Sequence, residues 1–393
     1  MCEQEDLQTE LSKLRSLKVV ILHDWLTGLR GGERVLESIC QLFPEAPLYT
    51  LIYNPNSTTH TIENRKIVVS FLTKLPNVHR YYRKLLPLFP LVAQSMKIPL
   101  DTDLIISSSH CVIKGIPRPA TGKCLHLSYI HSPMRYIYDQ FDNYFGPHSG
   151  AGLLERLGGK LLRGFFQRWD IKSNQHVDLL VANSEFVRQR IKKFYSREAL
   201  VANPFVEIKD FQQVQLNQPK KENYFLMVTA FAPNKRVDLA VATFIQQKVP
   251  LKIVGSGQQD KMLRDLAKGH SHIQFLGNLP RQQIISLLAR ARALIFPGIE
   301  DFGIVPLEAL AAGTPVIAFK SGGVLETLTD DVAVFFEEAT SDSLAKAIAQ
   351  FAKLEAIGFF SDRNKMFSRA KDFSPERFKS NIVKLLKHLT KIS

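Results

Sequence analysis

Two glutamates that flank a predicted helix start are the residues of this sequence best suited to chemistry. Glu300 and Glu308 enclose the segment Asp-Phe-Gly-Ile-Val-Pro-Leu. Because proline is tolerated only in the first turn of a helix, Pro306 predicts a helix that begins near Ile304 and stops at Gly313. The free N–H groups of such a start attract anions, and carboxylates accept hydrogen bonds from hydroxyl groups. The arrangement therefore suits a ligand that carries both phosphate and sugar hydroxyls.

The element before this helix must present the pair at the edge of a sheet. Residues 293–296 read as a short buried strand, which Pro297 and Gly298 end. This places Glu300 on the loop and Glu308 one turn inside the helix. Taken singly, Glu308 is also explained by the helix dipole and Glu300 by solvation on a loop. Their combination with the Ala-Gly-Thr-Pro-Val-Ile return strand favours a site.

Short apolar runs alternate with helical patterns along the whole chain, which predicts βα units and a parallel sheet. The runs form two series. The first covers residues 19–23, 104–107, 125–130 and 179–182, and the second covers 224–228, 251–254, 273–276, 294–296 and 316–319. A polar stretch at 214–223 separates them. We therefore expect an α/β chain with four parts: an extension at 1–18, one Rossmann-like domain at 19–205, another at 206–374, and a basic amphipathic helix at 375–393.

Composition limits the class of protein and of partner. The chain has 393 residues, 45% hydrophobic and 22% charged, which is typical of a globular protein with two domains. Lysine and arginine exceed aspartate and glutamate by 51 − 37 = +14. This excess fits nucleic acid, an anionic membrane or an anionic substrate, and the charge alone does not choose among them.

Four cysteines at positions 2, 40, 111 and 124 show no zinc or disulfide spacing, which indicates a reducing compartment. Residues 1–18 are polar, unlike a signal peptide, and no stretch approaches the roughly 20 apolar residues of a membrane span. The expected location is the cytoplasm, with peripheral contact to a membrane. Such contact is motivated by residues 72–90 and 153–169, which mix basic and apolar side chains.

Further candidate residues follow predicted strands. In the first domain, Gly31 and Gly32 precede a helical pattern and would let a backbone approach an anion, although a plain turn explains them equally well. His131 follows the run at 125–130. In the second domain, Lys235 and Arg236 would supply positive charge for a diphosphate. Two Gly-rich turns, at 255–257 and 321–323, follow strands of that domain.

Three motifs carry a resemblance to a known family. Glu300 and Glu308 match a Glu-x7-Glu signature, residues 31–35 read Gly-Gly-x-Arg-Val, and residues 131–136 read His-x-Pro-x-Arg-Tyr. The chain thereby resembles family four retaining glycosyltransferases, most of all the mannosyltransferase-like branch of bacterial polysaccharide, lipopolysaccharide and lipid glycan assembly. The resemblance implies the GT-B fold, with two Rossmann-like domains facing across a cleft and the C-terminal helix packed back on the first domain.

The resemblance also assigns roles to residues. It implies that His131 lies near the transferred sugar, that Glu300 holds sugar hydroxyls and that Lys235 binds the diphosphate; these are the predicted catalytic residues. The remaining predicted donor-binding residues are Gly31, Gly32, Arg135, Arg236, Gly255, Gly257, Asp301, Phe302, Gly303, Ile304, Val305 and Glu308. Ala230 stands where most of the wider family carries arginine, which leaves Lys235 and Arg236 for the phosphates. No cofactor and no metal are expected.

The resulting hypothesis is a retaining hexosyltransferase that uses GDP-mannose and a lipid or lipid-linked glycan acceptor at the inner face of the cytoplasmic membrane. A UDP-sugar-dependent transferase and a nucleotide-sugar epimerase or hydrolase of the same fold are the alternatives. A basic nucleic-acid-binding protein is a rival of another class, but the sequence contains no nucleic-acid-binding motif that would support it.

Overall fold

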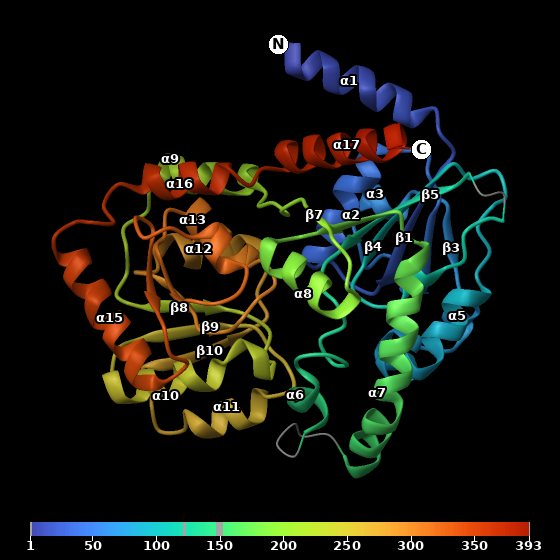
Figure 1. Cartoon of the computed structure of the whole chain (residues 1–393). Helices are drawn as coiled ribbons and strands as arrows, with labels where there is room; N and C mark the ends of the chain where they lie inside the picture. Colours follow the sequence, from blue (N-terminus) through green and yellow to red (C-terminus); the bar gives the residue numbers. More distant parts are fainter. Residues whose placement is uncertain (1, 121–122, 147–151, 393) are drawn as a thin grey trace. The chain divides into compact units, whose positions relative to one another are not determined.

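The computed structural model describes residues 2–120, 123–146 and 152–392. The chain forms two compact units (Figure 1). Unit 1 runs to Asn203 and includes the residues from Glu376 on, and unit 2 is Pro204–Pro375. The polar stretch at 214–223 lies inside unit 2, and residues Gln212–Asn217 form helix α9 there.

Unit 1 is built on one parallel sheet with the strand order β3-β2-β1-β4-β5-β6-β7. The strands are β1 Val19–Leu26, β2 Leu48–Tyr53, β3 Ile67–Val69, β4 Leu104–Ser109, β5 Leu125–Ile130, β6 Leu179–Ala182 and β7 Leu200–Val201. The four strands predicted in this part of the sequence are confirmed. Sequence reasoning missed β2, whose apolar run is interrupted by Tyr49 and Thr50, and the short β3 and β7 at the sheet edges.

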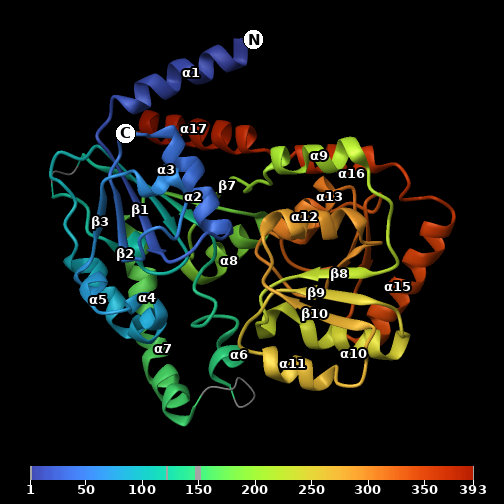
Figure 2. The same ribbon diagram turned by 180° about the vertical axis from the view of Figure 1, so that it is seen from behind.

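Helices cover both faces of this sheet (Figures 1 and 2). The helices of unit 1 are α1 Cys2–Arg15, α2 Gly31–Leu42, α3 His60–Glu63, α4 Val78–Tyr81, α5 Phe89–Ser95, α6 Phe141–Phe145, α7 Leu153–Ser173, α8 Glu185–Tyr195 and α17 Pro375–Ile392. One core joins alternate residues of the strands, such as Val20 and Leu22, to Phe89 of α5 and Phe166 of α7. The helix α2 covers the opposite face, since it follows β1 and contacts β1 and β4.

The C-terminal helix α17 packs on unit 1. Lys387 donates a hydrogen bond of 2.8 Å to Glu10 of α1, and Lys379 donates one of 2.5 Å to Gln41 of α2. The ring of Phe378 lies 5.7 Å from that of Tyr129 on β5. Residues of the C-terminal helix therefore pack against the helices and the sheet of unit 1.

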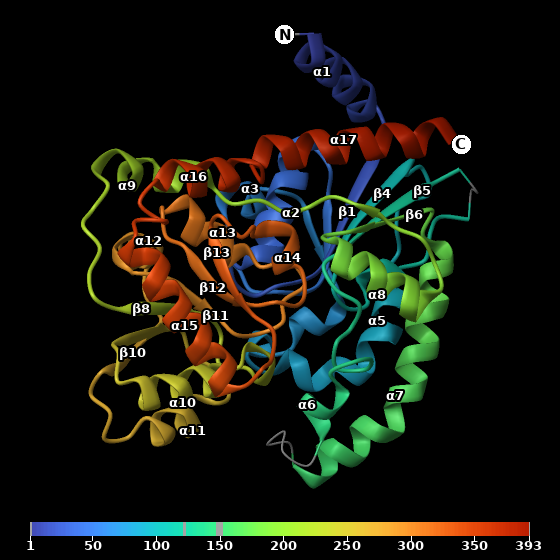
Figure 3. The ribbon, with the colours of Figure 1, turned by 60° about the vertical axis from the view of Figure 1, so that its left-hand side comes forward.

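Unit 2 contains a second parallel sheet, in the order β10-β9-β8-β11-β12-β13 (Figure 3). Its strands are β8 Phe225–Val228, β9 Leu251–Val254, β10 Ile273–Gly277, β11 Leu294–Phe296, β12 Val316–Phe319 and β13 Ala333–Phe336. Its helices are α9, α10 Val237–Gln247, α11 Asp260–Leu266, α12 Arg281–Arg290, α13 Ile304–Ala311, α14 Val324–Thr327, α15 Ser341–Ala356 and α16 Arg363–Lys371. The five strands predicted here are confirmed, and β13 was missed.

Alternation along the strands of unit 2 divides its core in two. Leu226 and Leu294 face a cluster that includes α12, α13 and α16, whereas Phe225 and Ile295 face one that includes α10, α11 and α15. Because both faces of this parallel sheet are buried, polar side chains that could bind a ligand are expected on the loops at the carboxyl ends of the strands. The predicted site residues of unit 2 lie mainly on these loops.

Candidate active site

In unit 2, three loops pack together so tightly that only glycine fits at their contacts. A Cβ atom at Gly298 would lie 2.5 Å from the carbonyl oxygen of Asn234, and one at Gly323 would lie 2.2 Å from that of Asp301. The N–H group of Gly323 donates a 2.9 Å hydrogen bond to the carbonyl of Glu300. The glycines therefore fix the loop that carries Glu300 between residues 232–236 and 321–323.

This packing brings two predicted residues together. Lys235 forms an ion pair with Glu300, and about a fifth of each side chain is exposed. The neighbouring Arg236 has φ = 51° and pairs at 3.3 Å with Asp238 of its own helix. Lys235 is therefore the cation that the structure places beside the Glu300 carboxylate.

Glu308 has partners that sequence reasoning missed. Its carboxylate, mostly buried, accepts a hydrogen bond of 2.7 Å from Arg281 at the start of α12. The same guanidinium donates one of 2.5 Å to Asp210. Arg281 lies 27 residues before Glu308, and no local pattern links the two positions. The guanidinium fixes the direction of the carboxylate in α13.

The start of α13 was predicted correctly. The helix begins at Ile304, and Gly303 precedes it with φ = 93°, a backbone conformation that favours glycine. Phe302 is buried in the core, with its ring 5.6 Å from Phe373, so that only its backbone is available to a ligand. Asp301 is buried as well, and Val305 is half-buried.

Gly255 and Gly257 serve the packing of neighbouring loops. A Cβ at Gly255 would lie 1.8 Å from the carbonyl oxygen of Thr229, and one at Gly257 would lie 2.6 Å from that of Phe231. The turn after β9 is thereby held against residues 229–231, next to the exposed Ala230. These contacts give a packing reason for glycine at both positions.

In unit 1, the polar residues gather at the carboxyl ends of β1, β4 and β5. Asp24 of β1 is buried, and its carboxylate accepts four hydrogen bonds of 2.7–2.9 Å from the backbone N–H groups of residues 110–113. The Nδ1 atom of His110 lies 3.4 Å from the same carboxylate. Asp24 therefore fixes the loop after β4 and the ring of His110.

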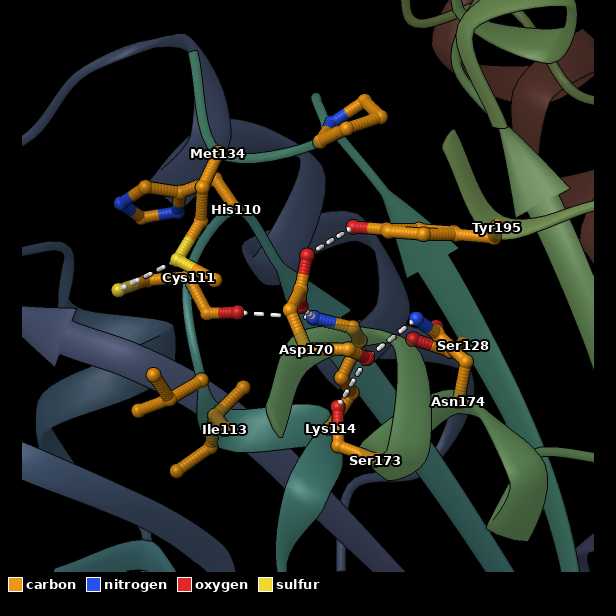
Figure 4. Close-up of polar contacts among 12 residues, drawn as sticks. His110, Cys111, Ile113, Lys114, Ser128, Met134, Asp170, Ser173, Asn174 and Tyr195 are labelled. Atoms are coloured by element: carbon orange, nitrogen blue, oxygen red, sulfur yellow. Dashed lines mark hydrogen bonds and ion pairs between the residues drawn. The ribbon is translucent and has the colours of Figure 1, made fainter. Parts of the chain in front are cut away.

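A buried ion pair holds the other end of this loop (Figure 4). Lys114 donates hydrogen bonds of 2.5 Å to Asp170 of α7 and 2.9 Å to the carbonyl of Cys111. Asp170 also accepts from the hydroxyl groups of Tyr138, at 3.0 Å, and Tyr195, at 2.9 Å. Both charged groups are almost completely buried, so these bonds are needed to offset their desolvation.

Three histidine rings lie near the predicted glycine pair. The rings of His23, His110 and His131 have centroid separations of 6.1–6.4 Å. A Cβ at Gly32 would lie 3.8 Å from the ring of His131, so the structure brings these two predicted residues together. Gly31 and Gly32 form the first turn of α2. Arg135 is half-buried in the loop that follows β5.

Sequence reasoning missed His23 and His110, although His110 directly follows β4 as His131 follows β5; His23 lies within β1, paired with Ser108 of β4. Burial lowers the pKa of His23 to about 3, and it lowers the pKa of His110, on which the positive charges of Arg30 and Arg83 act in the same direction. Both rings are therefore neutral near pH 7 and suited to hydrogen bonding. Among the residues that the structure describes, no group of three His, Cys, Asp or Glu side chains is placed to hold a metal ion.

Comparison with known proteins identifies the sequence pattern of unit 2. Residues 208–373, which are less than half of the chain, match the family model of glycosyl transferases group 1. A GDP-mannose-dependent monoacylated alpha-(1-6)-phosphatidylinositol monomannoside mannosyltransferase of Corynebacterium glutamicum is 39% identical over 109 residues, 25% of this chain and 29% of that protein. The human alpha-1,3/1,6-mannosyltransferase ALG2 is 26% identical over 250 residues, 55% of this chain and 59% of that protein.

The chain thus matches only 29% and 59% of the length of these two relatives. Among solved structures, Anabaena Alr3699/HepE in complex with UDP and glucose superposes with a TM-score of 0.67 at 17% identity, covering 94% of this chain and 99% of that one. An identity this low shows the fold alone. The predicted fold class is confirmed: the chain has the GT-B fold, and its residues 208–373 carry the pattern of glycosyl transferases group 1.

Proposed function

We propose that the protein is a retaining glycosyltransferase that moves a hexose, with mannose from GDP-mannose as the first candidate, to a lipid or lipid-linked glycan acceptor. The observation that carries the proposal is the ion pair of Lys235 with Glu300, held on glycine-fixed loops beside the start of α13. In our proposal, the cation of this pair serves the phosphate oxygens and the carboxylate serves the sugar hydroxyls. Glu308, one turn into α13, is proposed to hold the ribose.

The chemistry follows from the charges that develop during transfer. The departing diphosphate gains negative charge, and the anomeric carbon gains oxocarbenium character. In our proposal, Lys235 and the N–H groups at the start of α13 stabilise the phosphates, as do the N–H groups of Gly31 and Gly32. Glu300 and His131 hold the sugar. The leaving phosphate removes the proton of the acceptor hydroxyl on the same face. Lys235 and the N–H donors meet the charge of the diphosphate, a role that a metal ion would otherwise fill.

GDP-mannose is favoured by the relatives. The two reported relatives are named as mannosyltransferases, and one of them as GDP-mannose-dependent. The solved structure of Alr3699/HepE contains UDP, which keeps UDP-sugars as the second candidate. A binding measurement has to choose between the two bases.

A lipid acceptor at an anionic membrane is supported by the surface of α7. Leu153, Leu157, Leu161 and Phe165 recur every four residues and are exposed, Leu161 to 82%. Lys160 and Arg168 are exposed on the same arc of the helix. Such a face buries apolar side chains among lipid tails while its cations meet anionic headgroups. In the described part of the chain, we find no helix with the length and apolarity to cross a bilayer. Peripheral binding to the inner face of the cytoplasmic membrane is our proposal.

A thermal-shift panel tests the donor. Wild type, Glu308→Ala and the exposed control Glu338→Ala are heated with GDP-mannose, GDP, UDP-glucose, UDP-N-acetylglucosamine and UDP, with and without magnesium. A ligand at 100 times its dissociation constant stabilises the fold by about 2.7 kcal/mol. We expect a shift with the guanosine nucleotides that Glu338→Ala keeps and Glu308→Ala loses. A shift with UDP ligands alone would replace GDP-mannose, and no shift with any nucleotide would contradict the proposal.

Hydrolysis or epimerisation of the sugar is tested by the same ligands. The stabilising nucleotide sugar is incubated with the enzyme, with and without an extract of membrane lipids, and the products are separated. Transfer requires the extract. Release or rearrangement of the sugar at the same rate without it would indicate the hydrolase or epimerase alternative.

A further inference from the structure

Trp25 connects two segments of unit 1 near the carboxyl end of its sheet. The ring of Trp25, close to the end of β1, lies 4.3 Å from that of His110 and 5.1 Å from that of Tyr82. Tyr82 begins a short 3-10 helix, Tyr82–Leu88, in the segment that follows β3. The guanidinium carbon of Arg83 lies 5.8 Å from the centroid of the Tyr82 ring. Arg83 therefore belongs to the same cluster of rings as His110.

A second arginine comes to this cluster from another element. Arg30 is the N-cap residue of α2 and directly precedes the glycine pair. A Cβ at Gly32 would lie 3.8 Å from the ring of His131, whose centroid is 6.2 Å from that of His110. Arg30 and Arg83 thus stand on two elements that lead to the same group of histidine rings.

No acid balances the two arginines. Both side chains are exposed, and in the described part of the chain neither guanidinium has a hydrogen bond or an ion pair. The carboxylate of Asp24 lies 3.4 Å from His110, but it already accepts four hydrogen bonds from backbone N–H groups. Glu33 is buried and accepts its hydrogen bond from the backbone N–H of Arg30. The two positive charges are therefore free to meet an anion from solvent.

The two charges act on the ring of His110. Burial lowers the pKa of this ring to about 3, and the positive charges of Arg30 and Arg83 follow as causes in the same direction. The side chain is still 31% exposed, so a ligand in solution can reach it. Two like charges beside one neutral ring repel each other and create a positive potential there. A bound anion would relieve this repulsion.

The apolar surface beside Arg83 indicates what carries the anion. Four apolar side chains of the segment 71–91 are exposed, to between 40% and 63%: Phe71, Leu75, Leu88 and Leu91. Leu88 ends the same 3-10 helix in which Arg83 lies. Cations next to exposed apolar side chains suit an amphiphile with an anionic head group. A nucleotide sugar has no apolar chain that would use such a surface.

We propose that Arg30 and Arg83 bind a phosphate group of the acceptor, and that the acceptor is a lipid phosphate whose apolar chain lies along residues 71–91. A guanidinium group matches the geometry of phosphate oxygens with paired N–H donors. Because His110 lies next to His131, the phosphate is held close to the residue proposed to hold the sugar. This inference rests on the proposed function for the reaction, and it narrows the acceptor to one with a phosphate near the hydroxyl that receives the sugar.

Binding of octyl phosphate to the full-length protein tests the inference without donor or turnover. Tryptophan fluorescence measures it, since Trp25 lies between His110 and Tyr82. We expect octyl phosphate to bind more tightly than inorganic phosphate or octanol, and its dissociation constant to rise roughly tenfold in Arg30→Gln and in Arg83→Gln. The control is Lys97→Gln, which removes another exposed positive charge of unit 1 and should bind like wild type.

The nucleotides of the thermal panel separate this site from one for the donor diphosphate. Arg30→Gln and Arg83→Gln should keep the wild-type thermal shift with the stabilising nucleotide, whereas the amount of lipid extract that half-saturates transfer should rise roughly tenfold. A lost nucleotide shift in the two variants would assign the arginines to the donor and overturn the inference.

Three results of the octyl phosphate titration would also overturn it. They are no binding by wild type, binding of inorganic phosphate as tight as that of octyl phosphate, and an equal loss in Lys97→Gln. If no nucleotide sugar is turned over, the proposed function fails, and the octyl phosphate titration still decides the inference.

Discussion

Arg281 holds Glu308 through a hydrogen bond of 2.7 Å, and the same guanidinium reaches Asp210 at 2.5 Å. The arginine lies at the start of α12 and the glutamate within α13, and 29% and 13% of their side chains are exposed. A guanidinium that donates to two carboxylates fixes the direction of both. The carboxylate proposed to hold the ribose is thereby oriented before any ligand binds.

The first prediction is that Arg281→Gln weakens donor binding about as much as Glu308→Gln does. A hydrogen bond to a charged group contributes about 1.5–3 kcal/mol, so a rise of roughly tenfold or more in the dissociation constant of the donor nucleotide is expected. Calorimetric titration measures it. Arg264→Gln is the control, since it removes an exposed ion pair with Asp260 in the same unit. Unchanged or tighter binding by Arg281→Gln would show that the pair does not prepare the site.

A second prediction concerns Gly298, where an added Cβ would lie 2.5 Å from a backbone oxygen and 2.7 Å from the Cα of Lys235. Gly298→Ala should separate the loops that bring Lys235 to Glu300, and it should lower kcat/KM by roughly 100-fold, as small displacements of positioned groups do. Gly158→Ala in α7 is the matched control, because nothing lies within 4 Å of its added methyl group. That change should raise helix stability by up to about 1 kcal/mol. Equal activities of the two variants would contradict the argument.

Local signals explain what the sequence could predict. Pro306 and Gly313 determine where α13 begins and ends, so Glu300 and Glu308 could be placed on their elements without a structure. The pairing of Lys235 with Glu300 could have been predicted from the strand order, because the two residues follow the neighbouring parallel strands β8 and β11.

Contacts between distant elements could not be predicted. Lys114 and Asp170 are 56 residues apart, and nothing in the sequence around either residue indicates that both are buried in one ion pair. Arg281 likewise reads as an ordinary charged residue in the first turn of a helix. The contact between Ser108 and His23 depends on the register of β1 and β4, which pairs these two residues directly. Such a register is set by the packing of the whole sheet.

The third prediction concerns the exposed face of α7. Leu161→Gln should weaken binding to vesicles that contain anionic lipid, because the exposed leucine loses an apolar contact worth about 1.5 kcal/mol or more, or roughly tenfold in the partition coefficient. Leu216→Gln in α9 of unit 2 is the control, since that leucine is exposed to a similar 79%. Flotation with vesicles measures both. Equal loss in both variants, or no binding by wild type, would remove the support for a membrane acceptor at this face.

The last prediction uses His126, a buried histidine of β5 whose Nε2 lies 2.8 Å from the hydroxyl of Ser107. Burial lowers the pKa of this ring to about 3, whereas a histidine in the unfolded chain has a pKa of about 6.5. Between these values the unfolded state binds a proton that the folded state does not, so the free energy of unfolding falls as the pH drops below about 6.5. At about 1.4 kcal/mol per pH unit, the ring should cost roughly 2 kcal/mol at pH 5. Between pH 7 and pH 5, the free energy of unfolding of His126→Gln should therefore fall by about 2 kcal/mol less than that of wild type, as measured by denaturant unfolding of unit 1.

Ser107→Ala keeps the titrating ring and should show the wild-type pH dependence at a lower stability. Parallel curves for wild type and His126→Gln would mean that this ring does not contribute to the acid sensitivity of the fold.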